Sequence, residues 1–229
     1  MQLMTVGSSK AFSAGSRLQE CLTVVALVAF LTGCTTGSRA TTDSFRLLVN
    51  QQAKATMEQV AANPYPQLQL KATDLSAVAV LAYVDQGNLA WFASNQAVFY
   101  TDIRGLLLST TGLGRSYHSK IVGASPFENL NALTGTTKVS RKYDWLPGYQ
   151  FDAEVTGTLT RLNNESVDLL GRRISLTRFE EHLTGSGMNE TNVYWVDPAT
   201  GTILKSRQYL APGYKVELQY LKPYRPSTN

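Results

Sequence analysis

An apolar run that ends in a cysteine constrains this chain more than any other feature. Residues 21–31 carry almost uninterrupted hydrophobic side chains and lead into the motif Leu31-Thr32-Gly33-Cys34. Basic residues precede the run, small residues stand directly before the cysteine, and a polar segment follows it. This order is typical of a secretory signal peptide. A cysteine immediately after the cleavage site predicts a bacterial lipoprotein signal, in which residues 1–33 are removed and Cys34 becomes the first mature residue.

Two other interpretations of the run are weaker. A transmembrane helix needs about 20 consecutive apolar residues, roughly twice the length of this core. A buried helix of the folded domain does not account for the basic and small residues on its flanks. We therefore expect acyl chains on the sulfur and the new amino group of Cys34. Stable anchoring requires more than one chain, because each buried methylene contributes only about 0.8 kcal/mol.

The residues that follow the cysteine predict where the protein resides. Thr35 stands where bacterial lipoproteins retained in the inner membrane generally carry aspartate, so we expect outer-membrane sorting and a domain on the periplasmic face. Residues 34–42 are small and polar without periodicity, which is typical of a flexible tether. Residues 43–229 are long enough for a single domain with its own core, and we expect one periplasmic β-domain there.

Charge and cysteine usage exclude several classes of function. Removal of Lys10, Arg17 and Glu20 with the signal lowers the formal charge from +4 to +3. That charge is mild and forms no basic cluster, which argues against nucleic acid as a partner. Cys21 lies in the signal and Cys34 is consumed by lipid, so the mature domain keeps no thiol for a disulfide, a metal or a nucleophile.

Two helices are expected. The first begins at a cap on Asp43 or Ser44 and ends before Asn63, because the following prolines cannot continue it. Its apolar residues recur at spacings of three and four, which places them on one face of an amphipathic helix. They are Phe45, Leu48, Val49, Ala53, Met57 and Val60. A second, short helix is expected at residues 126–133.

The remainder of the chain reads as short strands separated by turn signals. Strands are expected at residues 77–84, 89–93, 97–101, 106–110, 139–145, 149–162, 167–170, 174–183, 194–196, 203–210 and 214–221. Residues 112–136 are less regular, and Asn163-Asn164 is expected to reverse the chain. This pattern predicts a mainly β fold, an antiparallel meander curved into a half-barrel or a sandwich, without internal repeats.

Several segments together resemble a known family. They are Pro64-Tyr65, Leu81-Ala82-Tyr83, Trp91, Gly105-Leu106, Thr111-Gly112-Leu113, Tyr194-Trp195-Val196-Asp197, Gly201 and Lys205-Ser206-Arg207-Gln208-Tyr209-Leu210. With the lipoprotein signal, they resemble the lipoproteins of group 4 capsule and YjbF-type exopolysaccharide operons of Gram-negative bacteria. The resemblance implies a mostly antiparallel β fold and a role in making or exporting surface polysaccharide beside other products of the operon. It brings no recognised active site.

The residues themselves offer little catalytic chemistry. Glu180-Glu181-His182 lacks a third strong metal ligand, and Ser116 and His118 have no nucleophile elbow around them. Carboxylates for sugar hydrolysis are present, but any two of them would have to meet in space. Those considered are Asp144, Asp152, Glu154 and Glu165. We expect no catalytic residues, no metal and no cofactor other than the lipid on Cys34.

Aromatic residues around one turn suggest a contact with carbohydrate. Tyr143, Trp145 and Tyr149 flank Leu146-Pro147-Gly148, and Arg141 lies close in sequence. Aromatic faces can stack on sugar rings and arginine can meet acidic sugars, although aromatics also pair across strands for purely structural reasons.

The sequence thus favours a non-enzymatic accessory factor in capsule or exopolysaccharide assembly or export. Expected partners are the membrane, proteins of a polysaccharide operon and the polysaccharide itself. One alternative is a lipid or lipoprotein carrier with an open apolar half-barrel. Another is a glycan-modifying enzyme.

Overall fold

The computed structural model describes residues 55–93, 97–112 and 115–226. Its elements, in chain order, are α3 (Met57–Ala62), β1 (Gln67–Ala72), β2 (Ser76–Asp85), β3 (Asn88–Phe92), β4 (Val98–Asp102), β5 (Leu107–Thr111), β6 (Ser116–Val122), the 3₁₀ helix η3 (Pro126–Ala132), β7 (Thr136–Leu146), β8 (Gln150–Leu169), β9 (Arg172–Gly185), β10 (Met188–Val196), β11 (Ile203–Ala211) and β12 (Tyr214–Lys222). In this part of the chain, no helix has the length and apolar character to cross a bilayer. The predicted signal peptide, Cys34 and the predicted tether lie outside the described residues.

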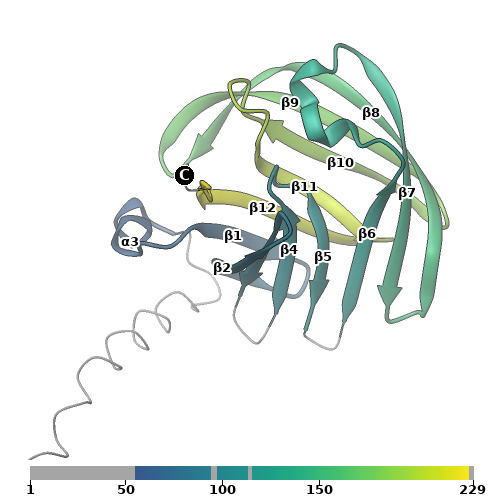
Figure 1. The fold of residues 1–229 in the computed structure, drawn as a ribbon, viewed down its shortest axis with the longest axis horizontal. Helices are drawn as coiled ribbons and strands as arrows, with labels where there is room; N and C mark the ends of the chain where they lie inside the picture. Colours follow the sequence, from purple (N-terminus) through teal and green to yellow (C-terminus); the bar gives the residue numbers. More distant parts are fainter. Residues whose placement is uncertain (1–54, 94–96, 113–114, 227–229) are drawn as a thin grey trace, which may run out of the picture. The chain divides into compact units, whose positions relative to one another are not determined.

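The strands form a closed barrel (Figure 1). Each strand pairs antiparallel with its neighbours in sequence, and β1 completes the circle by pairing with β2 on one side and β12 on the other. Within β1, Leu70 stands opposite both Ala77 and Leu218. The predicted antiparallel meander is confirmed, but the half-barrel or sandwich is wrong because the first and last strands join. Closure joins the first strand to the last, whereas the far end of the β8–β9 hairpin extends beyond the pairing with β7 and β10.

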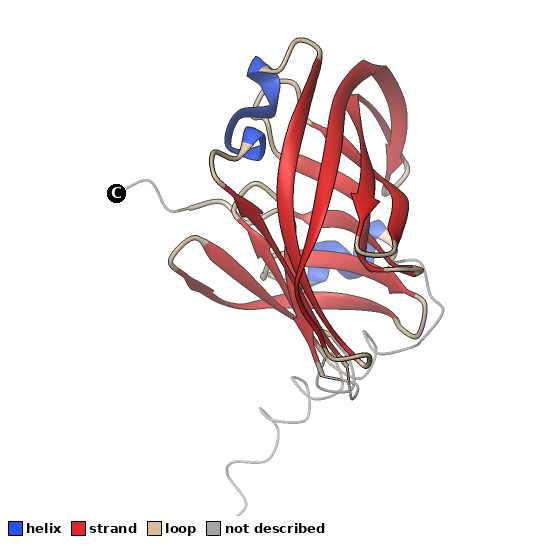
Figure 2. Cartoon of the chain, turned by 90° about the vertical axis from the view of Figure 1, so that its right-hand side faces the viewer, coloured by secondary structure: helices blue, strands red, loops and turns tan. Residues whose placement is uncertain are grey.

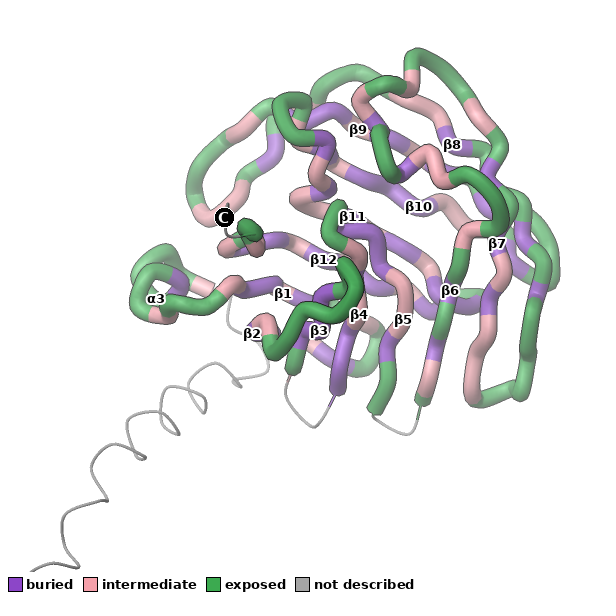
Figure 3. The backbone as a smooth tube through the Cα atoms, in the orientation of Figure 1, coloured by how far each residue is buried: buried purple, intermediate pink, exposed green. Residues whose placement is uncertain are grey.

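The barrel interior is filled by side chains. Figure 3 shows buried and exposed residues alternating along the strands, as expected when one face of each strand points inward. Trp91 is fully buried and donates its indole N–H to the Thr101 hydroxyl at 3.0 Å. The Tyr220 ring meets Trp91 edge to face at 5.5 Å, and its hydroxyl lies 3.0 Å from the same Thr101 oxygen. This polar triad satisfies the donors and acceptors that large aromatic side chains bring into a core.

Turn chemistry predicted many of the strand ends, but no strand was predicted over β1 or β6, and one predicted turn is absent. The predicted reversal at Asn163-Asn164 is wrong, because β8 continues through it to Leu169. The pairing of β8 with β9 instead shifts register between Arg161 and Asn164, as in a β-bulge. A bulge bends its strand and increases the local twist. The chain reverses later, at Leu170-Gly171, so β8 and β9 form one long hairpin, whose end curves back toward β12 in Figure 1. Figure 2 shows that strands make up most of the described fold and that its helical segments are short.

The two helical predictions fared differently. The 3₁₀ helix η3 confirms the short middle helix, and Ser125 caps it by accepting a hydrogen bond from the Phe127 N–H. Most of the predicted amphipathic helix, residues 43–54, lies outside the described residues. Within them, Thr56 has an extended backbone and serves as the N-cap of α3. A capping box between Thr56 and Gln59 starts α3 at that point. The helix ends before Asn63, as predicted.

One partly buried carboxylate, that of Asp102, makes the stability of the barrel depend on pH. Asp102 ends β4 and closes the β4–β5 turn by accepting hydrogen bonds from the N–H groups of Arg104 (2.9 Å) and Leu106 (2.8 Å). Burial raises the pKa of Asp102 from 3.8 to about 6, although these bonds lower it. The native carboxyl therefore holds its proton more tightly than the unfolded one. Between about pH 4 and pH 6, ionisation of Asp102 removes stability as the pH rises.

Asp102→Asn keeps an oxygen that can accept both turn hydrogen bonds and removes the charge. We compare the free energy of unfolding of the variant with that of the original protein at each pH. We expect this difference to favour the variant more at pH 8 than at pH 4. The change is at most about 3 kcal/mol, since one pKa unit corresponds to about 1.4 kcal/mol. Denaturant unfolding at both pH values measures it. The exposed Asp85, changed to Asn, controls for the loss of a surface charge. An equal effect of Asp102→Asn at both pH values would contradict the expectation.

Candidate functional site

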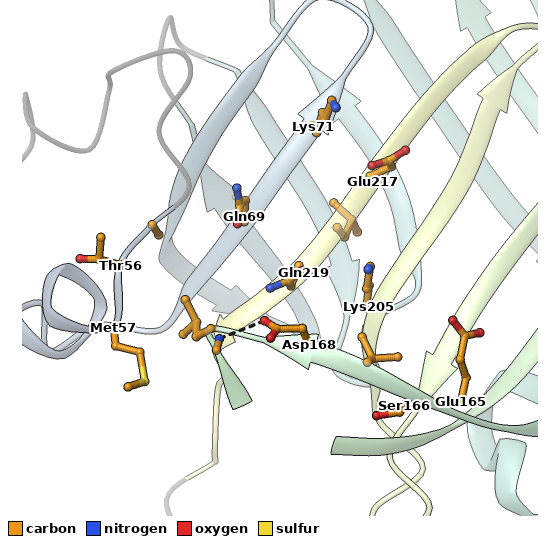
Figure 4. Close-up of a pocket in the computed structure, with 15 residues that line it drawn as sticks. Thr56, Met57, Gln69, Lys71, Glu165, Ser166, Asp168, Lys205, Glu217 and Gln219 are labelled. Carbon is orange, nitrogen blue, oxygen red and sulfur yellow. Dashed lines mark hydrogen bonds between the residues drawn. The ribbon is translucent and has the colours of Figure 1, made fainter. Parts of the chain in front are cut away.

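A groove of about 610 Å³ lies on the outer face of the barrel, where β11, β12 and β1 are neighbours (Figure 4). Its floor consists of side chains that alternate with inward-pointing core residues such as Leu70 and Leu218. The far end of the β8–β9 hairpin forms one wall, and Thr56 and Met57 at the start of α3 also line the groove. The bulge bends β8, and the end of the β8–β9 hairpin lies beside the outer face of β1, β11 and β12.

The floor of the groove is polar. Three pairs of its side chains stand opposite each other in register: Gln69 with Gln219, Lys71 with Glu217, and Lys205 with Gln219. Amide, ammonium and carboxylate groups thus lie in adjacent rows across three strands. Together they offer both donors and acceptors of hydrogen bonds. Such a surface suits a polyhydroxylated or charged ligand better than an apolar one.

The hairpin wall is tied to the barrel through Glu165. Its Oε2 accepts a hydrogen bond from the Trp195 indole N–H at 3.0 Å and lies 3.5 Å from a guanidinium nitrogen of Arg178. The ammonium of Lys205 lies 5.0 Å from the centre of the Trp195 ring, within the range of a cation–π contact. At the hairpin tip, Asp168 accepts the Gly171 N–H at 2.9 Å, a bond drawn in Figure 4. Floor and wall are therefore held in a fixed relation.

The four residues predicted to contact carbohydrate do not share a surface. Arg141 and Tyr143 point into the barrel and are only 3% and 1% exposed, whereas Tyr149 is 80% exposed. Trp145, the next inward position of β7, is partly buried. A polymer outside the barrel cannot touch Arg141 or Tyr143, and this corrects the prediction for both. Carbohydrate contact by Trp145 and Tyr149 stays a prediction.

Arg141 belongs to a buried polar network inside the barrel. Its guanidinium donates two hydrogen bonds to the Glu181 carboxylate, at 2.7 and 2.9 Å. The same carboxylate accepts from the Tyr194 hydroxyl at 2.7 Å and from the Asn192 amide at 3.1 Å. Asn192 in turn accepts the backbone N–H of Tyr209. The network thus joins β7, β9, β10 and β11 across the barrel interior.

Electrostatics fix the protonation of this network. Burial lowers the pKa of Arg141, but the charge and hydrogen bond of Glu181 together with Tyr143 and Tyr194 outweigh it, so the net pKa shift is upward and the guanidinium stays charged. Burial raises the pKa of Tyr143 to about 12 and raises that of Tyr194 well above its ordinary value, with the Glu181 charge adding to the effect at both. Both phenols are therefore neutral at physiological pH. The charged pair is buried and joined to its neighbours by several hydrogen bonds, which makes its role structural.

Two positions in the sequence carry a signal for this network. Glu181 occupies the same inward register of β9 as Phe179 and Leu183, both fully buried. A carboxylate at an inward position needs a partner inside the barrel. Gly157 of β8 carries a second signal, because a Cβ at that position would collide with the Glu181 carboxylate. The sequence analysis treated Glu181 only as a candidate metal ligand, named Tyr194 only within the family resemblance, and did not consider Asn192.

Comparison with known proteins gives consistent results across sequence and structure. A family model described as "Group 4 capsule polysaccharide lipoprotein gfcB, YjbF" matches residues 25–221. The uncharacterized lipoprotein GfcB of Escherichia coli (strain K12) is 30% identical over 202 residues, which span 85% of this chain and 94% of that protein.

Solved structures extend the comparison. The crystal structure of the hypothetical lipoprotein YmcC from Escherichia coli (K12) has a TM-score of 0.67 and 28% identity, covering 80% of this chain and 96% of that one. An exported protein of Bacteroides fragilis with a YmcC-like fold is more distant, with a TM-score of 0.33 and 11% identity over 70% of this chain and 94% of that one.

Proposed function

The chain belongs to the family of group 4 capsule polysaccharide lipoproteins typified by GfcB and YjbF, and on that premise we propose that it is a non-enzymatic accessory factor in the assembly or export of capsule or exopolysaccharide. In this proposal, lipid on Cys34 anchors the protein in the outer membrane, and the barrel works on the periplasmic side. The observation that carries the proposal is the family match, which spans residues 25–221 and so includes the lipoprotein motif as well as the barrel.

The groove supplies a surface on which an accessory factor can act. Its polar floor can hydrogen-bond a passing polysaccharide or a partner protein from the same operon. The interior of the barrel favours such a surface role. It holds the satisfied Arg141–Glu181 pair and the Trp91–Thr101–Tyr220 triad, where a lipid or lipoprotein carrier would need an apolar cavity.

One observation favours a glycan-modifying enzyme as the second candidate. Three carboxylates, from Glu165, Asp168 and Glu217, line the same groove. Glycosidases use pairs of carboxylates on either side of the bond they cleave. Incubating the purified protein with the polysaccharide of its native cells, and measuring new reducing ends, separates this candidate from the first. Activity that disappears in Glu217→Gln would favour the enzyme.

Deletion of the gene in cells that make the polysaccharide tests the accessory role. We expect the deletion strain to lose most of its surface polymer, or to make it with an altered chain length, and we expect a plasmid copy of the gene to restore both. Extraction and size-exclusion chromatography of the surface polymer measure amount and length together. Unchanged amount and unchanged length in the deletion strain would contradict the proposal.

A further inference from the structure

A second cavity, of about 380 Å³, opens at one mouth of the barrel. The turn after β1, the start of β6, the β7–β8 turn and the β11–β12 turn meet around it. Its lining is mostly aromatic and proline side chains with one basic group: Arg115, Tyr117, Trp145, Pro147, Pro212 and Tyr214. An apolar wall with a few placed polar groups is the usual composition of a small-ligand site, and its volume lies within the usual range. The groove on the outer face has apolar lining residues as well, such as Val167 and Leu170, but no aromatic ones.

The aromatic wall of the mouth is held in place by a chain of contacts. The rings of Tyr117 and Tyr214 stack at 4.1 Å with an angle of 13° between their planes. The Tyr214 hydroxyl donates to Asp74 at 3.1 Å, and the other oxygen of Asp74 lies 3.6 Å from the Arg115 guanidinium. Because the Arg115 side chain is 44% exposed, it keeps donors free for a ligand at the rim.

Trp145 differs from the other two tryptophans of the chain. Trp91 donates its indole N–H to Thr101, and Trp195 donates to Glu165. The indole N–H of Trp145 has no acceptor among the described residues, although the ring is partly buried. Gly148, whose φ of +109° disfavours any side chain, passes beside the indole and leaves its edge open. Trp145 thus offers an unused donor and an apolar ring to the cavity.

We propose that this mouth binds a single pyranose ring of a glycan chain. The C–H face of the sugar packs on the aromatic wall, the Trp145 N–H donates to a ring hydroxyl, and Arg115 donates to a hydroxyl or to a uronic carboxylate. Tyr149 and Phe151 follow the β7–β8 turn and are 80% and 61% exposed, so neighbouring sugars have apolar surface beyond the mouth. This inference rests on the proposed function and names the ligand class that the barrel takes.

The three tryptophans lie in the core (Trp91), beside the outer groove (Trp195) and at the mouth (Trp145). One NMR spectrum of their indole N–H groups therefore shows at which of these places a ligand binds. The full lipoprotein, labelled with ¹⁵N-tryptophan and held in detergent micelles, is titrated separately with cellohexaose, with hexagalacturonic acid and with oligosaccharides from the native surface polymer. We expect at least one probe to move the Trp145 signal and leave Trp91 unmoved. Trp145→Phe assigns that signal. The neutral and acidic probes show whether Arg115 meets a hydroxyl or a carboxylate.

Arg115→Gln provides the matched variant, because it removes the charge at the rim, and an unmoved Trp91 signal in this variant shows that the core is intact. If the ligand is acidic, we expect about a tenfold loss of affinity for hexagalacturonic acid and little change for cellohexaose. The inference is overturned if no probe moves Trp145, or if only Trp195, beside the outer groove, responds. If the deletion strain loses its polymer but no probe moves the Trp145 signal, this inference is wrong and the proposed function stands. If a probe moves the Trp145 signal but the deletion strain keeps its polymer unchanged, the proposed function is wrong and the sugar site is supported.

Discussion

Replacing Arg141 with methionine is expected to lower the free energy of unfolding by about 3–5 kcal/mol. The change removes the cation and leaves the Glu181 carboxylate fully buried without its main partner. An unpaired buried charge costs far more than a lost surface contact, and the expected loss is a large part of the 5–15 kcal/mol typical of a folded domain. The shift of the urea midpoint, followed by circular dichroism, measures it.

Two further variants make this prediction specific. Arg178→Met is the matched control, because Arg178 pairs with Glu165 and Glu180 on the outer face, where its side chain is 35% exposed. Its loss should cost less than about 1 kcal/mol. The double variant Arg141→Met, Glu181→Met removes both charges and should recover part of the stability lost in the single variant. A single-variant loss no larger than that of Arg178→Met would show that the buried pair does not stabilise the barrel.

Replacing Cys34 with serine is expected to abolish lipid attachment, because a hydroxyl cannot take the place of the thiol in thioether formation. The protein should then incorporate no fatty-acid label and should disappear from the outer-membrane fraction. Anchoring depends on several tens of buried methylenes at about 0.8 kcal/mol each, so its loss is close to complete. Metabolic labelling with a clickable palmitate analogue, followed by fractionation of the envelope, measures both effects.

The chain contains its own control for the anchoring experiment. Cys21, the other cysteine, lies within the predicted signal, and Cys21→Ser should label and fractionate like the original protein. In the deletion strain, Cys21→Ser should restore surface polymer and Cys34→Ser should not. Fatty-acid label on the Cys34→Ser protein, or its persistence in the outer membrane, would contradict the predicted lipidation site.

Local turn chemistry explains why the hairpins were predictable. Asp85-Gln86-Gly87-Asn88 joins β2 to β3, and Ala211-Pro212-Gly213 joins β11 to β12, where the sequence places them. Glycine at positive φ and proline with its fixed φ act within a few residues, so a single sequence reveals them. Asn163-Asn164 has similar composition but forms a bulge in β8. Asparagine tolerates both conformations, and pairing with β9 decides between them.

Barrel closure had no comparable local signal. The pairing of Leu70 with Leu218 joins the two ends of the described barrel, and no turn residue marks it. The strand β1 itself lacked a turn signal on its amino-terminal side other than the prolines that end α3. Closure follows from the curvature accumulated over many strands, including the bulges, and that sum cannot be read from one stretch of sequence.

The candidate sites could not be predicted from the sequence for a similar reason. Alternation along β7 places Arg141, Tyr143 and Trp145 on one face, but it does not say that the first two lie deep in the barrel and the third at its mouth. Depth depends on where each strand starts relative to its neighbours. The aromatic mouth and the polar groove each combine residues from strands distant in sequence, so their composition emerged only from the fold.

Anchoring at Cys34 underlies the proposed location and role, and mass spectrometry of the protein extracted from the envelopes of its native cells tests it directly. We predict that the amino-terminal peptide begins at Cys34, with a diacylglycerol on the sulfur and an acyl chain on the amino group. A free thiol at Cys34, in protein recovered from the soluble fraction of those cells, would contradict it.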